Sequence, residues 1–242
     1  MRSPRLRSGE VKLGVTLALI LALAAGCGSE ESSSLPQGAE TVKLDPDDFS
    51  AKIDNPYWPM SPGSKWVYRE GEARVEVTVT KQTRKIIGIE ARVVHDVLTE
   101  DGKVKEDTFD WYAQDESGNI WYLGESTKEF DQGGKVSTEG SWEAGVDGAQ
   151  PGVLLPGEPK KGLSYRQEYY KGEAEDAAEV LSVDARARVP VGSFEQLLLT
   201  KEYTPLEPNV VEHKFYAKRV GPILAVTVSG GSGREELVQR RE

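Results

Sequence analysis

The sequence predicts a mainly β fold: one large antiparallel sheet, curved into a half-barrel or a sandwich. Apolar and polar residues alternate with period two over residues 74–80, 87–93 and 108–113, which is typical of strands with one buried face. Turn-forming runs at 100–103 (EDGK) and 115–119 (DESGN) suit hairpin connections between such strands. Further strand-like runs follow at 163–170, 178–184, 194–203, 210–217, 222–228 and 234–239.

The chain repeats parts of itself at an offset of about one hundred residues, which points to an internal duplication. Residues 62–68 (PGSKWVY) match 161–167 (KGLSYRQ) in position, and 109–113 (FDWYA) match 213–217 (HKFYA). Each of the latter two segments is followed by a glycine and an isoleucine. An offset of this size is too long for a solenoid repeat and suits two related halves of one sheet. The hypothesis fails if the two aromatic-Tyr-Ala segments occupy non-equivalent strands.

Two irregular segments interrupt the strands of the predicted domain, which covers residues 53–240. Residues 54–63 combine three prolines with Tyr57 and Trp58, so we expect an extended lid across the body. Residues 131–160 are rich in glycine and proline, but they also carry Trp142 and an apolar run at 153–155. We therefore expect this long loop to be ordered and packed.

The N-terminus has the order of features found in an export signal. Four basic residues precede an apolar run at 13–25, which ends in Gly26 and Cys27. As a helix, this run would reach about 20 Å, short of a bilayer core of about 30 Å. The segment LAAGC at 23–27 resembles the bacterial lipobox, so we predict a signal peptide at 1–26 and lipidation of Cys27 by several acyl chains, palmitate among them. A plain secretory signal followed by an incidental cysteine is the alternative.

Composition narrows the possible functions of the exported chain. The 242 residues contain one cysteine, two histidines and a net charge of −10, and removal of residues 1–26 would make that charge −13. One cysteine permits no internal disulfide, and the acidic balance disfavours nucleic acid, which binds basic surfaces. Residues 27–52 are rich in Ser, Glu, Asp and Pro, so we predict a disordered tether between the lipid and the domain. The expected location is extracytoplasmic, on a bacterial membrane.

No catalytic motif occurs, and we predict no cofactor and no metal site. The sequence lacks a GxSxG elbow, a phosphate-binding loop and an HExxH pair. Five carboxylates near the aromatic motifs could include a general acid and a general base, but we favour their interpretation as residues of solvated faces and turns: Asp110, Asp115, Glu125, Glu143 and Asp147.

Aromatic residues form the most distinctive constellation. All five tryptophans lie within residues 58–142, and adjacent aromatic pairs place large rings on both faces of their strands. One face can fill the core, while the other is either covered by the lid and the long loop or left for a ligand. The predicted ligand-binding residues are Trp58, Trp111, Tyr112, Trp121 and Trp142.

Several long motifs resemble a family of exported bacterial proteins and lipoproteins that has no assigned activity. They are NPYWPMSPGSKWVY, DWYAQDESGNIWYLGE, GSWEAGVDGAQPG, YRQEYYKGEAEDAAEV and HKFYAKRVGPILAV, which span most of residues 54–238. The segment FYAKRVGPILAV is also similar to a strand pair of half-barrel proteins related to lipoprotein carriers, and this second resemblance implies the fold more than the function.

Together these features predict a membrane-anchored lipoprotein that binds a ligand or partner through an aromatic-rich curved sheet, without catalysis. The partners would be the membrane, reached through the lipid, and an apolar ligand, a glycan or a protein. Two alternatives remain: a half-barrel factor that handles lipids or lipoproteins, and a hydrolase that uses a carboxylate pair.

Overall fold

A computed structural model describes residues 35–131 and 133–242, and residues 35–242 form one compact unit. The predicted signal peptide and Cys27 lie outside the described residues. The described chain contains one short 3-10 helix, η1 (Pro46–Asp48), and β-strands. The strands of the first part are β1 (Phe49–Ser50), β2 (Lys65–Glu70), β3 (Ala73–Ile86), β4 (Ile89–Glu100), β5 (Lys103–Asp115), β6 (Ile120–Phe130), β7 (Val136–Ser137) and β8 (Trp142–Glu143). Those of the second part are β9 (Gln150–Leu155), β10 (Ser164–Arg166), β11 (Glu168–Tyr169), β12 (Ala177–Val189), β13 (Gly192–Tyr203), β14 (Val211–Ala217), β15 (Gly221–Ser229) and β16 (Arg234–Arg241).

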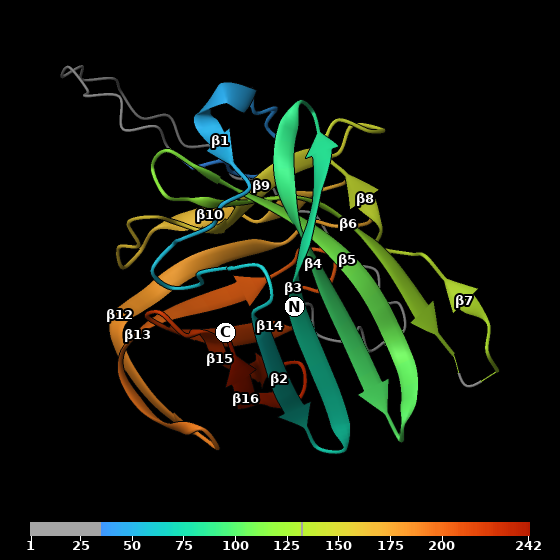
Figure 1. The fold of residues 1–242 in the computed structure, drawn as a ribbon, viewed down its shortest axis with the longest axis vertical. Helices are drawn as coiled ribbons and strands as arrows, with labels where there is room; N and C mark the ends of the chain where they lie inside the picture. Colours follow the sequence, from blue (N-terminus) through green and yellow to red (C-terminus); the bar gives the residue numbers. More distant parts are fainter. Residues whose placement is uncertain (1–34, 132) are drawn as a thin grey trace, which may run out of the picture. The chain divides into compact units, whose positions relative to one another are not determined.

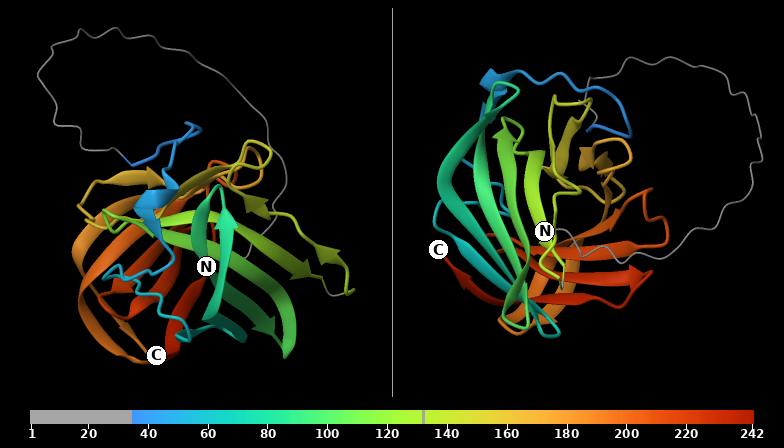
Figure 2. Two further views of the ribbon diagram at one scale, coloured as in Figure 1. Left: turned by 45° about the horizontal axis from the view of Figure 1, so that its top comes forward. Right: turned by 90° about the vertical axis from the view of Figure 1, so that its right-hand side faces the viewer.

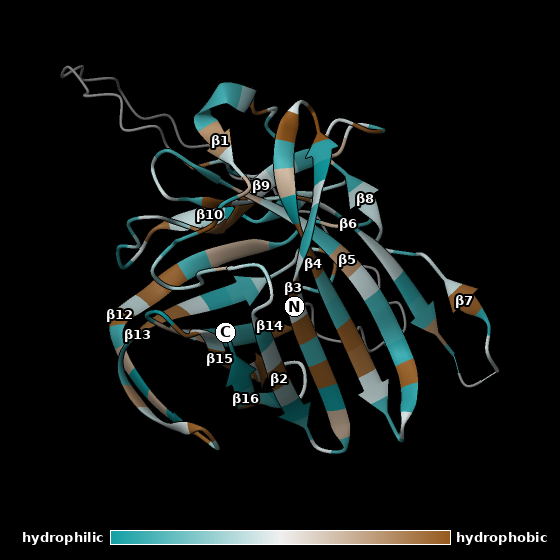
Figure 3. Cartoon of the chain, in the orientation of Figure 1, coloured by the Kyte–Doolittle hydropathy of each residue, from teal (hydrophilic) through white to brown (hydrophobic). Residues whose placement is uncertain are grey.

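These strands form one antiparallel sheet that is nearly closed into a barrel (Figures 1 and 2), which confirms the predicted fold class. Its order is β10-β12-β13-β14-β15-β16-β2-β3-β4-β5-β6-β9-β11. The two ends of this path approach each other where Arg166 in β10 donates a hydrogen bond to the carbonyl of Pro151 in β9, at 2.7 Å. Hydrophobic and hydrophilic residues alternate along β3, β4 and β5, as the bands of colour in Figure 3 show.

The predicted hairpins and strand runs coincide with observed elements. The turn at 100–103 joins β4 to β5, and the turn at 115–119 joins β5 to β6. The long loop at 131–160 contains β7, β8 and β9, and its Trp142 and residues 153–155 are buried. In the lid, Tyr57, Trp58 and Met60 are buried against the sheet, because these large apolar groups need cover from water.

The two matched sequence segments occupy equivalent strands, so the duplication hypothesis passes its own test. Residues 109–113 lie in β5, the fourth strand of the series β2-β3-β4-β5-β6. Residues 213–217 lie in β14, the fourth strand of the series β10-β12-β13-β14-β15. Strand β16 joins the two series edge to edge, and the half-sheets face each other across the curved body (Figure 2).

The predicted tether is too long at its C-terminal end, because residues 35–52 lie against the sheet. β1 pairs with β5, and Pro36 accepts a backbone hydrogen bond from Arg166. The Arg166 guanidinium also donates to the carbonyls of Gly38 at 2.8 Å and Glu40 at 2.7 Å. Side-chain composition predicts a tether here, but the backbone carbonyls of this segment meet a buried cation more than one hundred residues away.

Candidate functional site

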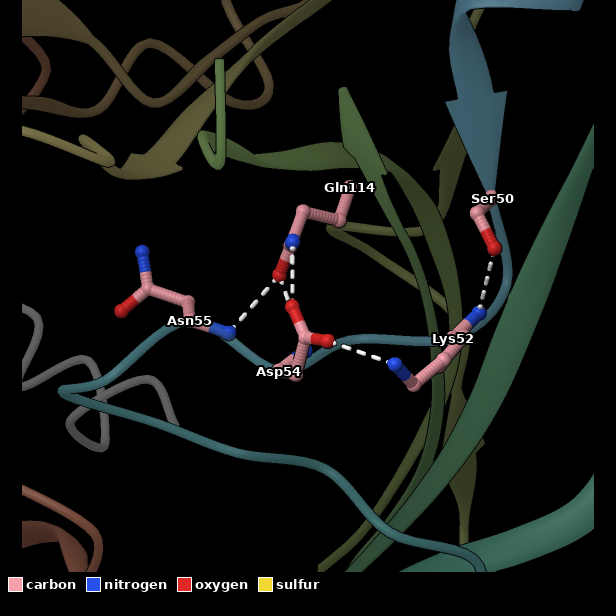
Figure 4. Close-up of polar contacts among 5 residues, drawn as sticks. All are labelled: Ser50, Lys52, Asp54, Asn55 and Gln114. Carbon is pink, nitrogen blue, oxygen red and sulfur yellow. Dashed lines mark hydrogen bonds and ion pairs between the residues drawn. The ribbon is translucent and has the colours of Figure 1, made fainter. Parts of the chain in front are cut away.

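The lid is held by two amide side chains that satisfy its backbone. Gln114 on β5 accepts hydrogen bonds from the backbone N–H groups of Asp54 and Asn55, and its own amide donates to the Asp54 carboxylate (Figure 4). Asn55 is buried and donates to the carbonyls of Gly118 and Pro156, while its side-chain oxygen accepts from the N–H of Tyr57. These bonds fix the position of the aromatic residues that follow.

Beneath the lid, aromatic rings pack into a continuous core on one face of the sheet. Trp58 meets Trp66 edge-on with centroids 6.2 Å apart and lies 6.1 Å from Tyr112. Tyr112 stacks on Tyr122 at 4.9 Å, and Tyr122 meets the edge of Trp142 at 5.3 Å. This face, which also carries the buried Tyr68, is called the inner face below.

The remaining two predicted aromatic residues lie on the opposite, outer face of the sheet. Trp111 lies under the guanidinium of Arg84, 4.1 Å from the ring centroid. Trp121 packs against Phe49 of β1 at 5.9 Å and donates to the Asp115 carboxylate. All five predicted residues are only 1–6% exposed, and they do not form one site. The rings act here as packing on both faces, and ligand binding by them remains a prediction.

Five of the carboxyl groups on the inner face are called the inner acid cluster: Asp96, Glu106, Asp110, Glu125 and Glu235. Asp110 on β5 lies opposite Glu125 on β6, and Asp96 on β4 lies opposite Thr108 on β5. Glu106 shares a face with Thr108 and Asp110 because side chains two apart on a strand point the same way. Glu235 on β16 lies two residues before Leu237, which pairs with the buried Tyr68.

One hydroxyl bridges two members of the cluster. The Tyr122 oxygen lies 2.6 Å from an oxygen of Asp110 and 2.9 Å from an oxygen of Glu125. A phenol has a single proton to donate, and both carboxyl groups are buried. The Tyr122 hydroxyl can therefore donate to only one of the two carboxyl groups at a time. Burial, followed by the charges of Asp110 and Glu125, raises the pKa of Tyr122 well above 10, so the phenol stays neutral.

Burial also favours the protonated form of three members of the cluster. It raises the pKa of Asp96 to about 7, and the neighbouring charges of Asp110 and Glu106 act in the same direction. It raises the pKa of Glu235 to about 8, with Asp96 adding to the effect. Burial likewise raises the pKa of Glu106. The cluster therefore gains negative charge as pH rises from mildly acidic to mildly basic values.

The cluster becomes more accessible toward the β4–β5 hairpin. Along the inner side of β5, Asp110 is buried, whereas Glu106, which lies closer to the hairpin, is half-buried. Asp96 on β4 is half-buried as well. The gradient gives the carboxylates near the hairpin a route to solvent, whereas Tyr112 and Tyr122 close the deeper end.

Of the five carboxylates singled out in the sequence, only Asp110 and Glu125 come together. Asp115 accepts bonds from Asn119 and Trp121 in a turn, Glu143 pairs with Arg84, and Asp147 has a positive φ of 49° in a loop. Sequence reasoning missed Asp96, Glu106 and Glu235. Strand parity held a signal for Asp96, because it occupies the same side as its apolar neighbours Val94 and Leu98.

Within the described residues, no group of three or more His, Cys, Asp or Glu side chains is arranged to hold a metal ion. The part of the chain that the structure describes also has no helix with the length and apolar character needed to cross a bilayer.

Comparisons with known proteins leave the family open. No family model matches the chain, and no curated protein matches it. One solved structure is similar: a candidate lipoprotein from Parabacteroides distasonis ATCC 8503, at 9% identity and a TM-score of 0.40. The match covers 76% of this chain and 98% of the other. A likeness of this degree does not define a common fold or function.

Proposed function

We propose that the protein is an exported bacterial lipoprotein, anchored through Cys27, that binds a ligand on the inner face of its curved sheet without catalysis. The observation that carries the binding role is the inner acid cluster. Carboxyl groups taken out of water cost free energy unless they are paired, and perturbed carboxyl groups of this kind concentrate at functional sites. A sheet built only for stability would place apolar side chains at these inward positions.

The same cluster argues against a lipid carrier. An acyl chain needs an apolar concavity, but the accessible part of the inner face carries Asp96 and Glu106. The apolar part is already filled by the stacked rings of Tyr112 and Tyr122 and by Trp58 from the lid. Binding of a polar ligand near the β4–β5 hairpin fits the observations better than binding of a lipid among the rings.

A carboxylate-dependent hydrolase is the second candidate, and it has one observation in its favour. Asp110 and Glu125 both lie within hydrogen-bond distance of the Tyr122 hydroxyl, so two carboxyl groups stand close together, as the acid and the base of acid–base catalysis do. Asp110→Asn would abolish such an activity. A glycosidase and esterase screen in which the wild-type protein exceeds this variant would favour the hydrolase over the binding protein.

The anchor is tested by the fate of Cys27. The wild-type protein should sediment with membranes, and its N-terminal peptide should carry a mass consistent with acylated cysteine. Cys27→Ser should remove this mass and release the processed protein, or leave an uncleaved precursor. An unmodified Cys27 in the membrane-derived protein would contradict the proposed anchor.

Ligand binding is tested by intrinsic fluorescence, since Trp58 and Trp66 lie next to the inner face. The full-length protein in a non-ionic detergent would be titrated with panels of organic cations, glycans and peptides. We expect at least one compound to change the emission in a saturable way and to lose affinity in Glu235→Gln. If no compound changes the fluorescence or the melting temperature of the protein, the binding role is refuted.

A further inference from the structure

The duplication places a charged pair in one half of the sheet where the other half has two acids. Lys214 lies two residues before Tyr216 in β14, and Asp110 lies two residues before Tyr112 in β5. Glu202 pairs across strands with Glu212, which lies two residues before Lys214. In the same way, Asp96 pairs with Thr108, which lies two residues before Asp110. Glu202 and Lys214 in the second half therefore correspond to Asp96 and Asp110 in the first.

In the second half, an ammonium group compensates the buried acid. The Nζ of Lys214 lies 2.6 Å from an oxygen of Glu202, and both side chains are nearly buried. Thr200 and the hydroxyl of Tyr216 donate further hydrogen bonds to the same carboxylate. Burial opposes ionisation of Glu202, but Lys214 and these bonds outweigh burial and lower the pKa of the carboxyl group.

In the first half, the chain supplies no equivalent ammonium from the described residues. No lysine or arginine in the described part of the chain lies within ion-pair distance of Asp96, Glu106, Asp110 or Glu235. The position that Lys214 holds in the second half is occupied here by Asp110, which places a second acid beside Tyr122. The two halves share the strand order and the buried tyrosines, and they differ in the group that would balance the charge.

Glu235 provides a second observation. Its side chain is 9% exposed, and no partner among the described residues reaches its Oε1 atom by a hydrogen bond. It lies on the inner face of β16, two residues from Leu237, which pairs with Tyr68. The charges of Asp96 and Glu70 act against its ionisation, and the more distant ammonium of Lys214, which is paired with Glu202, offsets them only in part. A buried carboxylate oxygen without a partner destabilises the fold, so an oxygen of this kind is prepared for a donor from outside the chain.

We propose that the inner acid cluster binds a linear polyamine, whose ammonium groups take the place in the first half that the Lys214 ammonium holds in the second. This inference rests on the proposed binding function and names its ligand class. Carboxylates on β4, β5 and β16 call for more than one positive charge, which a polyamine carries along a slender chain. A metal ion fits less well, because the described side chains do not converge as metal ligands.

The test is calorimetric titration of the full-length protein with spermine at pH 8, in a non-ionic detergent and low salt. We expect saturable binding that weakens at least tenfold in Glu235→Gln. The matched control is Glu236→Gln, which alters the next residue of β16 on the outer face and should keep the wild-type affinity. Equal affinity of the two variants for spermine would overturn the proposal. So would displacement of spermine by Mg²⁺ that is as effective as displacement by unlabelled spermine at the same concentration of positive charge.

A second variant places an ammonium group of the chain itself in the inner acid cluster. Asp110→Lys would give the first half the arrangement of the second, so its own ammonium should occupy the cluster and reduce spermine affinity at least tenfold. Unchanged affinity in a folded Asp110→Lys protein would overturn the proposal. If tetralysine or a neutral ligand binds in a Glu235-dependent way and spermine does not, the polyamine inference fails while the binding function stands. If nothing binds, both fail.

Discussion

Replacement of Glu235 by glutamine should stabilise the protein at high pH and leave its stability nearly unchanged at low pH. Glu235 has an ordinary pKa of 4.5 when unfolded and about 8 in the folded protein, chiefly because of burial. The folded state therefore holds a proton that the unfolded state has lost between these two values. Stability due to this proton is fully present below about 4.5 and is lost as pH rises through about 8.

The size of the effect follows from the proton affinity. Each tenfold difference in proton affinity between the two states is worth about 1.4 kcal/mol, so the limit for Glu235 is about 5 kcal/mol above pH 8. Asp96 shares the repulsion and can release it by taking up a proton itself, so we expect roughly half of that limit, about 2–3 kcal/mol. At pH 5 the two proteins should agree within about 0.5 kcal/mol, because the neutral carboxyl group and the amide differ little.

Urea unfolding followed by tryptophan fluorescence at pH 5, 7 and 9 measures this difference directly. Glu236→Gln is again the control, since its carboxylate pairs with Arg234 at the surface and should contribute little at any pH. A Glu235→Gln difference that does not grow with pH, or a variant less stable than wild type at pH 9, would refute the electrostatic reasoning.

Three further substitutions test the structural assignments by urea unfolding and proteolysis. Asn55→Ala should cost about 2–3 kcal/mol, because it removes three hydrogen bonds of a buried lid residue; a change below 0.5 kcal/mol would contradict that role. Lys214→Met should cost about 3–5 kcal/mol by leaving the Glu202 charge buried, and adding Glu202→Gln should recover most of the loss. Arg166→Met should cost about 3 kcal/mol and expose residues 38–50 to protease, whereas unchanged cleavage would show that another contact holds the segment.

The fold was predictable because its signals are local. Alternation over a few residues predicts each strand, and the turn at 100–103 predicts its connection. The repeated aromatic-Tyr-Ala segments also predict the equivalence of β5 and β14, because duplicated segments keep their neighbours. The position of residues 35–52 was not predictable in the same way, since it depends on Arg166, which lies far away in sequence and offers no local pattern.

The assembly of the inner acid cluster as one group was beyond sequence reasoning for a related reason. Asp110 and Glu125 stood among five abundant carboxylates, and nothing local distinguished them from Asp115 or Glu143. Glu235 joins the cluster only because β16 lies between β15 and β2, a neighbour relation that alternation does not reveal. The aromatic residues, in contrast, were visible as a group, but their separation onto two faces depends on which segments cover them.

A crystal structure of the protein with spermine would show whether the inner face of the first half-sheet receives an ammonium group from a ligand. We expect an amine nitrogen about 3 Å from a carboxylate oxygen of Asp96, Asp110 or Glu235, in the manner of Lys214 and Glu202. Spermine bound only on the outer acidic surface, with the inner acid cluster unchanged, would contradict it.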